Sequence, residues 1–200
     1  MINASIVILL ESEWLIAGGE SELGTADLAP IKDGDGLPVI PGRTLRGLLR
    51  EATTLIDDAH RSSHATRLFG TRKQPGASAD AGDGALRIGN AVVAAELANL
   101  CDSTDSRQDF YTSVRRTALE PGTRTAKAHS LREFEVAIAG LELVAPLACP
   151  DEESLGIVAF AAGLVRSLGH SRSRGLGRCR MEVWRDGACI APALAARGKP

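Results

Sequence analysis

The chain has 200 residues, enough for one domain with a sizeable core and insertions, and its 44% hydrophobic and 24% charged residues are ordinary for a soluble globular protein. Its formal net charge of −2 does not favour a nucleic-acid binder as a whole, so binding of a polyanion would depend on local clusters of charge. The four cysteines are scattered without a C-x-x-C pair, which argues against a zinc ribbon or a disulfide scaffold and fits a reducing cytoplasm.

The N-terminal part is predicted to form a strand and then a long loop. Residues 4–10 are apolar and β-branched, in a run too short for a core helix, which indicates a buried strand. Residues 15–42 are rich in glycine and include three prolines, so we expect a loop insertion there. This region is acidic, because seven carboxylates between Glu11 and Asp35 stand against Lys32 alone.

A helix is predicted from Thr44, as its N-cap, to about Asp58. Five apolar residues share one face of this helix at the helical period: Leu45, Leu48, Leu49, Ala52 and Ile56. Three arginines gather on the opposite side, spaced i, i+3 and i+7: Arg43, Arg46 and Arg50. Such a stripe is typical both of a solvated helix face and of a surface that binds a polyanion.

The middle of the chain alternates short apolar segments with polar insertions. After the apolar Leu68-Phe69-Gly70, residues 70–85 are rich in Gly, Ala, Asp and Pro and predict a mobile loop. Residues 86–93 are predicted to form a strand, and residues 102–131 a second polar insertion. Alternating hydrophobic residues then indicate a half-buried strand with a turn or bulge at Gly140: Phe134, Val136, Ile138, Leu141 and Leu143.

The C-terminal part is predicted to hold a second helix and a last strand. The helix starts at Asp151 or Ser154 and reaches Leu168, with Gly169 at its C′ position. In residues 179–183, apolar side chains alternate with polar ones, as in a half-buried strand. The order strand, helix, strands, helix, strand indicates an α+β, ferredoxin-like (RRM-like) antiparallel sheet with two helices on one face. We expect a single domain over residues 1–200, with insertions around 15–42, 70–85 and 102–131.

The segment before the last strand has the most informative composition: Gly169-His-Ser-Arg-Ser-Arg-Gly-Leu-Gly177. Five arginines and no acidic residue lie between Leu164 and Met181. Glycines let a ligand approach the main chain, and guanidinium and N–H groups together suit a phosphodiester, although a solvated connection is also compatible. The order of Arg174 and Gly175 excludes a Walker A loop. Arg180, where a third glycine would be needed, excludes the dinucleotide-binding pattern.

Three separated segments share the motifs of one protein family. Leu37-Pro-Val-Ile-Pro-Gly-Arg-Thr-Leu-Arg-Gly-Leu-Leu-Arg50 resembles the opening of the first helix in RAMP-superfamily CRISPR proteins. Leu86-Arg-Ile-Gly-Asn-Ala-Val-Val93 is similar to the second-strand segment of that family. Leu168-Gly-His-Ser-Arg-Ser-Arg-Gly-Leu-Gly-Arg178 resembles its glycine-rich signature loop. The order and spacing agree over nearly the whole chain.

Within this superfamily, the resemblance is greatest to the backbone subunit of type III (Csm/Cmr) effector complexes. Residues 115–127 are similar to the segment that leads into the thumb-like hairpin of that subunit, although Glu120-Pro121 replaces the usual Asp-Arg. The resemblance implies that copies of the chain assemble head to tail along a CRISPR RNA (crRNA), with other effector subunits. The assembled copies would present the guide to a complementary target RNA, and the sequence leaves a DNA target open.

The resemblance also implies which residues contact RNA. They lie on the first helix, the glycine-rich loop and the thumb: Arg43, Arg46, Arg50, Gly169, His170, Ser171, Arg172, Arg174, Gly175, Gly177, Arg124 and Lys127. Contacts of this kind to phosphates and sugars position RNA without reading its sequence. Recognition would then be left to guide–target base pairing.

One acidic loop resembles the catalytic loop of the subunits that cut the target. Ala26-Asp-Leu-Ala-Pro-Ile-Lys-Asp33 aligns Asp27 with the catalytic aspartate of those subunits and Asp33 with a second aspartate. A carboxylate there would hold a divalent cation such as Mg²⁺, or position a ribose 2′-OH for attack on its own phosphate. The resemblance thus implies a metal-dependent endoribonuclease, while acidic residues in glycine-rich loops are also commonly solubilising.

Two other functions remain open at this point. Related RAMP proteins process precursor crRNA by metal-free general acid–base cleavage, which would use His60 or His170 together with Tyr111. The other alternative is a non-catalytic scaffold that binds only neighbouring protein subunits. His60 and His64 have the i, i+4 spacing of a metal-ligand pair if the helix extends that far, but no third ligand is evident. No apolar run approaches the roughly 18 residues needed to span a bilayer, so we expect a cytoplasmic protein without a membrane partner.

Overall fold

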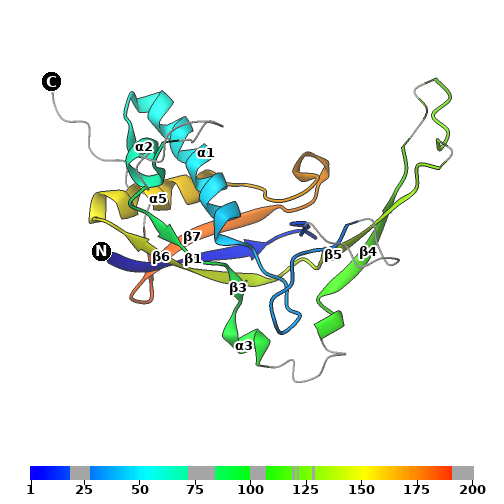
Figure 1. Ribbon diagram of the computed structural model, residues 1–200, viewed down its shortest axis with the longest axis horizontal. Coiled ribbons are helices and arrows are strands. Elements are labelled where there is room, and N and C mark those ends of the chain that lie inside the picture. Colours follow the sequence, from blue (N-terminus) through cyan, green and yellow to red (C-terminus); the bar gives the residue numbers. More distant parts are fainter. Residues whose placement is uncertain are drawn as a thin grey trace.

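The computed structural model describes residues 1–18, 28–71, 84–99, 107–118, 120, 122–127 and 129–190 (Figure 1). Its centre is an antiparallel sheet with three long strands, β1 (Ile2–Leu10), β6 (Glu142–Cys149) and β7 (Cys179–Arg185). The strand order is β2-β6-β1-β7-β8, with the short β2 (Arg87–Ile88) and β8 (Ala188–Cys189) at the edges. This order and the antiparallel pairing confirm the predicted α+β, ferredoxin-like sheet.

Alternation of side chains places the core on one face of the sheet. Ile6, Ile8 and Leu10 of β1 are buried, whereas Leu9 is 37% exposed. Ile6 lies opposite Ala145 of β6 and Val183 of β7, which are buried as well. The residues between them point to the other, more open face, because successive side chains of a strand alternate.

Two helices cover the buried face of the sheet, as predicted (Figure 1). In α1 (Gly42–His60) the apolar stripe is buried at Leu45, Leu49, Ala52 and Ile56. The helix α5 (Glu152–Leu164) is buried on most of its circumference, where small residues let it pack closely against the sheet and α1. The described residues contain no helix that is long and apolar enough to cross a membrane.

The start of α1 differs from the prediction. The helix begins at Gly42, and its N-cap position is Pro41, so the predicted Thr44 cap is wrong. The Gly42 N–H donates instead to the side-chain carbonyl oxygen of Asn90, at 2.9 Å. A side chain at position 42 would meet the Ile88 carbonyl oxygen at 2.6 Å, which explains the glycine. A residue 48 positions away therefore caps the helix.

The end of α5 also differs from the prediction. Asp151 caps its start, because its carboxylate accepts the Ser154 N–H at 2.8 Å. The helix ends at Leu164, since Val165 is already extended, and so Gly169 is not its C′ residue. Residues 166–168 pair instead with residues 177–179, with Ser167 opposite Arg178. The chain thus enters the glycine-rich loop from an extended strand-like segment.

The predicted strand over residues 86–93 is divided into β2 and β3 (Val92–Val93), which both pair with β6. Gly89 and Asn90 lie between them, and position 89 requires glycine because a side chain there would lie 2.5 Å from the Pro146 ring. Asn90, the second residue between β2 and β3, is the one that caps α1. Two short helices complete the body, α2 (His64–Phe69) and α3 (Ala95–Ala98).

A second, two-stranded sheet projects from the body as a hairpin (Figure 1). It consists of β4 (Tyr111–Arg116) and β5 (Arg132–Ala137), the second of which is the half-buried strand predicted around Phe134. A turn follows at Gly140, where φ is +82°, as predicted. Parts of the three predicted insertions lie outside the described residues: 19–27 in the first, 72–83 in the second, and 102–106, 119, 121 and 128 in the third.

Candidate nucleic-acid interface

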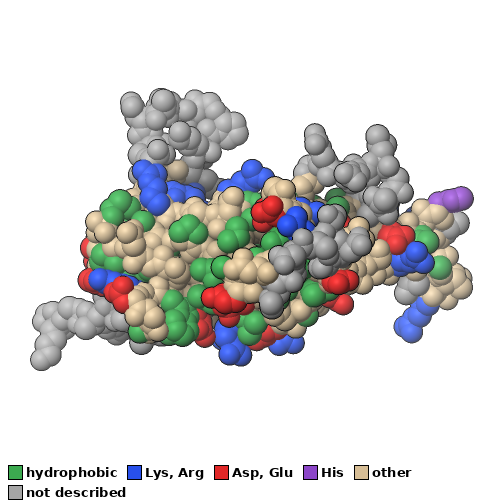
Figure 2. All heavy atoms as spheres, turned by 90° about the horizontal axis from the view of Figure 1, so that it is seen from below, with side chains coloured by type: hydrophobic (Ala, Val, Ile, Leu, Met, Phe, Trp, Pro, Cys, Tyr) green, Lys and Arg blue, Asp and Glu red, His purple; other side chains and the backbone are tan. Residues whose placement is uncertain are grey.

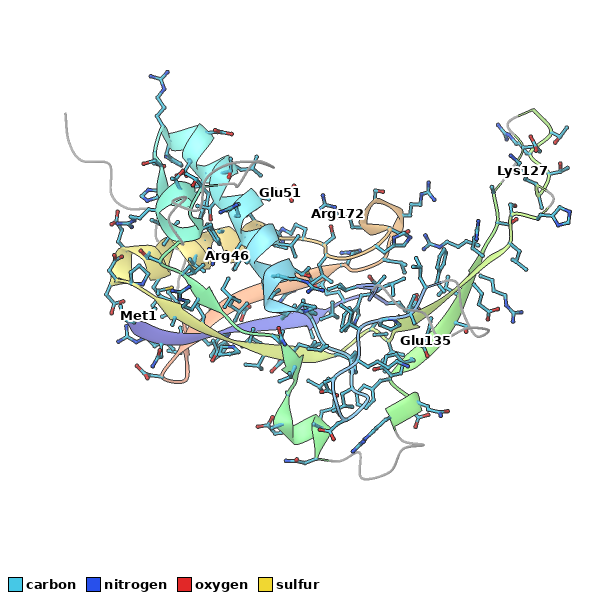
Figure 3. The ribbon with its side chains drawn as sticks, viewed as in Figure 1. Met1, Arg46, Glu51, Lys127, Glu135 and Arg172 are labelled. Atoms are coloured by element: carbon cyan, nitrogen blue, oxygen red, sulfur yellow. The ribbon has the colours of Figure 1, made fainter. Side chains whose placement is uncertain are left out.

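The glycine-rich loop lies beside the arginine-bearing helix. The short 3-10 helix η1 (Arg172–Arg174) forms the tip of the loop. One guanidinium nitrogen of Arg172 is 3.6 Å from a carboxylate oxygen of Glu51 on α1, and Figure 3 shows these two side chains close together. An exposed ion pair of this kind contributes little stability. Its value is geometric, because it shows that two segments 121 positions apart share one surface.

Only one glycine of the loop lies open at the surface. A side chain at Gly169 would meet the Leu15 carbonyl oxygen at 2.3 Å, and one at Gly177 would meet the Leu168 carbonyl oxygen at 1.9 Å. Both glycines also have positive φ, +78° and +71°. They are therefore required for close packing of the protein main chain. Gly175, with φ of +90° and nothing within 4 Å of an added Cβ, is the glycine that a ligand can approach.

Arg46 and Arg50 of the α1 stripe are engaged by the protein itself. Arg46 donates to the carbonyl oxygens of Leu86 and Phe69 at 2.8 and 2.9 Å. Arg50 donates to the carbonyl oxygens of Phe69 and Gly70. Both guanidinium groups also lie over the Phe69 ring, 5.7 and 5.9 Å from its centroid. These arginines tie α1 to the two segments that flank residues 71–85, a role that the helical spacing did not reveal.

Arg43, in the first turn of α1, is the exposed cation of the predicted stripe. In the loop, Arg172 and Arg174 are exposed, and Ser171 adopts a left-handed conformation with φ of 55°. On the face shown in Figure 2, acidic and basic side chains of the described residues are interspersed with hydrophobic ones. On this face, contact with a polyanion would therefore depend on small groups of cations, because the described residues show no large basic patch there.

A second hydrophobic cluster joins the hairpin to the glycine-rich loop. Its buried members come from three segments, and they are Leu15, Val136 and Leu176. The His170 ring lies against the Phe134 ring of β5, with centroids 5.6 Å apart. The His170 N–H donates to the Leu15 carbonyl oxygen at 2.7 Å. The loop and the base of the hairpin thus form one continuous structure.

The predicted catalytic residue, Asp27, lies outside the described residues. Its neighbour Leu28 is fixed at the base of the hairpin, where its carbonyl oxygen accepts the Glu135 N–H at 3.0 Å. Leu28 also forms a bridge with Phe134, the residue that contacts His170. The segment that follows Asp27 therefore runs beside the glycine-rich loop.

Asp33, aligned with a second family aspartate, stabilises a turn. One of its carboxylate oxygens accepts the N–H groups of Asp35 and Leu37, each at 2.9 Å. In the described structure, the Asp33 side chain therefore stabilises the turn formed by residues 33–37. Among the described residues, no group of three His, Cys, Asp or Glu side chains lies together to hold a metal ion.

Tyr111 is a structural residue at the base of β4. Its hydroxyl donates to the Gly36 carbonyl oxygen at 2.8 Å, and the Lys32 ammonium lies 4.1 Å from the centre of its ring. Burial, and then the nearby carboxylates of Glu135 and Asp33, raise the pKa of Tyr111 far above its usual value. The Tyr111 hydroxyl is thus committed to a structural hydrogen bond in the described residues, and the metal-free mechanism stays a prediction.

His60 and His64 do not form the predicted i, i+4 pair on one helix. His60 is the last residue of α1, Arg61 has a left-handed conformation, and His64 begins α2. The condition for a two-histidine metal site is therefore not met. Asp57 stabilises the turn between α1 and α2, because its carboxylate accepts hydrogen bonds from the Ser62 hydroxyl and from the N–H groups of His64 and Ala65.

Arg124 and Lys127 are exposed in the loop that joins β4 to β5. Figure 3 shows Lys127 at the projecting end of the hairpin, away from Arg172. The structure therefore brings α1 and the glycine-rich loop together, and it carries the two thumb cations outward on a separate arm.

A sequence-family model described as the RAMP superfamily matches residues 8–180. No curated protein sequence matches the chain. Among solved structures, the chain is similar to one in "Type III-B Cmr-beta Cryo-EM structure of the Apo state", with a TM-score of 0.71 and 11% identity over 94% of this chain and 99% of that one. It is also similar to one in "Cryo-EM structure of the Type III-B Cmr-beta bound to cognate target RNA", with a TM-score of 0.68 and 11% identity over 92% and 97% of the two chains. Because the family model spans most of the sequence, the chain belongs to the RAMP superfamily.

Proposed function

We propose that this protein is a subunit of a type III CRISPR effector complex that binds crRNA and presents it to complementary target RNA. The observation that carries the proposal is the contact between Arg172 and Glu51, which joins the glycine-rich loop and α1 in one surface. Family membership supports it, as does similarity of fold to chains of a type III-B complex solved with cognate target RNA. Its partners would be crRNA, target RNA, further copies of the chain and other effector subunits.

The proposed guide-binding surface combines exposed cations with open main chain. Arg43 and Arg174 supply guanidinium groups that suit phosphate oxygens, and Gly175 leaves the main chain accessible. Arg172 would exchange its Glu51 partner for a phosphate oxygen. Contacts of this type would hold any guide sequence equally. Arg46 and Arg50 act indirectly, because their hydrogen bonds to main-chain carbonyls fix the segments around Phe69 and Leu86.

The proposed catalytic residue is Asp27, acting on target RNA. Its support is the position of Leu28, which lies against β5 and next to the Phe134–His170 pair. The Asp27 carboxylate would orient a ribose 2′-OH towards its own phosphate. A divalent cation such as Mg²⁺, if bound by this carboxylate, would stabilise the negative charge that develops on the phosphate.

RNA binding by the purified full-length chain tests this function. Arg174→Ala should lower the affinity for single-stranded RNA about tenfold and reduce the slope of log K against log salt by about one. The effect should be the same for unrelated RNA sequences, since the contact is to phosphate.

The matched control is Arg87→Ala, which removes an exposed arginine from β2 at the edge of the main sheet. It changes the net charge equally and should leave the affinity nearly unchanged. A wild-type chain that neither copurifies with RNA nor binds it would refute the proposal and support a purely structural subunit.

A further inference from the structure

The face of the main sheet that points away from α1 and α5 carries hydrophobic side chains, and we call it the open face (Figure 1). On the central strand β1, Leu9 is 37% exposed on this face and Val7 is half-buried. Val7 lies opposite Val144 of β6, which in turn lies opposite Val92 of β3, 43% exposed. Aliphatic side chains do not stack on bases as aromatic rings do, so this part of the face suits a protein better than RNA.

The two strands that flank β1 place complementary side chains on the open face. Leu9 lies opposite Glu142 of β6 on one side and opposite Arg180 of β7 on the other. Ser5 lies opposite Pro146 of β6 and Trp184 of β7 in the same way. The β6 side of the face thus offers a carboxylate and a proline ring. The β7 side offers, at the same two levels, a guanidinium group and an indole ring.

This pattern is self-complementary under a two-fold rotation about an axis parallel to β1. The rotation places the β1 strands of two copies face to face, and β6 of each copy over β7 of the other. Glu142 of each copy then faces Arg180 of the second copy, and Pro146 faces Trp184. A closed two-fold contact uses the same patch on both copies, and face-to-face packing of aligned sheets is a common arrangement.

The charges of this pattern are available for such a contact. Glu142 is exposed, and its carboxylate has no ion-pair partner among the residues that the structure describes. The Glu11 carboxylate lies 3.4 Å from the Arg180 guanidinium and 3.7 Å from that of Arg178, so one negative charge serves two positive ones. The β7 side therefore keeps a net positive charge, opposite to that of Glu142.

Trp184 is the aromatic residue of the open face, and its polar group is already satisfied. Its indole Nε1–H donates to a Glu182 carboxylate oxygen at 3.0 Å. The half-buried ring can therefore pack against an apolar surface without leaving a polar group unpaired. Trp is also one of the residues most enriched at protein–protein interfaces.

We propose that the open face binds a second copy of the chain in a two-fold symmetric dimer. Strands lie about 4.8 Å apart and rise about 3.3 Å per residue, so the face from β3 to β7 measures roughly 20 by 20 Å, or about 800 Å² for two copies. This area is at the low end for protein–protein contacts, and we expect a weak, reversible dimer with a dissociation constant on the order of 10 μM. Unlike a head-to-tail contact, this one uses the same face of both copies. It also requires no RNA, and it thus goes beyond the proposed function.

Charge reversal tests the pairing across the two-fold axis. In sedimentation velocity, the average mass of the nuclease-treated, full-length wild-type chain should rise from one copy towards two as its concentration increases to about 200 μM. Glu142→Arg would bring like charges together at both symmetric pairs, and so would Arg180→Glu. We expect either change to raise the dissociation constant about tenfold or more.

A mixture of the two variants gives the most specific result. A Glu142→Arg copy and an Arg180→Glu copy have opposite charges at both pairs, so an equal mixture should form the dimer that neither variant forms alone. Recovery in the mixture would also show that both variants are folded. Asp58→Arg is the matched control, since it reverses an exposed carboxylate on α1, on the helix-covered side, and should leave dimerisation unchanged.

Three results would overturn the proposal. A wild-type chain that remains a single copy over the whole concentration range excludes the dimer. Equal dimerisation of Glu142→Arg and Asp58→Arg places the contact on another surface. A mixture of the two reversed variants that stays monomeric excludes the two-fold pairing of Glu142 with Arg180. None of these results affects the proposed function, because Arg174→Ala tests RNA binding separately.

Discussion

Asp57 shows how one carboxylate can organise the junction between two helices. It is 8% exposed, lies in the last turns of α1 and accepts three hydrogen bonds from residues 62, 64 and 65. Burial raises the pKa of Asp57, but the hydrogen bonds from Ser62, Ala65 and His64 outweigh burial and leave the pKa below its ordinary value of 3.8. The folded state thus favours the ionised carboxylate.

The sign of the resulting pH dependence follows from linkage. Because the folded pKa lies below the unfolded one, Asp57 stabilises the protein above about pH 4 and loses this contribution as the pH falls through the folded pKa. We expect Asp57→Ala to reduce the free energy of unfolding by about 1–3 kcal/mol at pH 7, and by less at pH 3. Urea unfolding at both pH values measures this. The exposed neighbour Asp58 is the control, and an equal loss in Asp58→Ala would contradict the assignment.

Asn90 makes a comparable contribution from outside the helix that it caps. Its side-chain oxygen accepts the Gly42 N–H at 2.9 Å, whereas Pro41 provides no capping side chain. Asn90→Ala should therefore reduce the free energy of unfolding by about 1 kcal/mol. Thr44→Ala removes the residue that the local sequence pattern favours as the cap, and chemical denaturation should show a smaller loss. The reverse order would mean that Thr44 caps the helix.

Among the elements, the glycine-rich loop shows how the same residue type serves two purposes. Gly177 passes against the Leu168 carbonyl oxygen, while Gly175 faces open space. Gly175→Ala carries only the strain of a positive φ and should lower stability by about 1 kcal/mol. Gly177→Ala adds a main-chain collision and should cost roughly 3–5 kcal/mol. Thermal unfolding of both variants compares them, and similar melting temperatures would exclude this division of roles.

Elements defined by local periodicity were predictable from the sequence. The alternation of Cys179, Met181 and Val183 and the apolar stripe of α1 led to β7 and to the correct helix face. Local patterns failed where a distant residue decides the geometry. Asn90 caps a helix 48 residues earlier, Gly89 must clear Pro146, and Arg46 reaches a carbonyl 40 residues away. None of these partners has a signal in the neighbouring sequence.

In the candidate site too, local sequence patterns were informative, whereas contacts with distant residues were not predictable. The arginine-rich composition of residues 169–178 pointed to the loop, and the contact between Arg172 and Glu51 joins it to α1. Helical spacing placed Arg46 and Arg50 on one stripe with Arg43, but it could not show that protein carbonyls receive their hydrogen bonds.

For the whole molecule, a body and a projecting arm meet at one junction. The Leu15, Val136 and Leu176 cluster holds the arm to the glycine-rich loop, and Leu28 lies at the same place. A strand of RNA bound to both Arg43 of α1 and Arg174 of the glycine-rich loop would therefore lie close to this junction, because Leu176 of the same loop belongs to the cluster. Asp27 directly precedes Leu28 in the chain. Because target RNA would be bound only in the assembled complex, the catalytic role of Asp27 is a prediction about that complex.

Asp27→Ala should leave guide loading and assembly intact, because the proposed RNA contacts belong to other residues, while target cuts that require a divalent cation disappear. The measurement combines the RNA content of the purified complex with the length pattern of a labelled complementary RNA after addition of Mg²⁺. Asp33→Ala is the structural control, since Asp33 stabilises the turn at residues 33–37 through two hydrogen bonds and should affect stability more than cleavage. Undiminished cutting by the Asp27→Ala complex would exclude this carboxylate from catalysis. Loss of RNA from that complex would instead assign Asp27 a part in assembly.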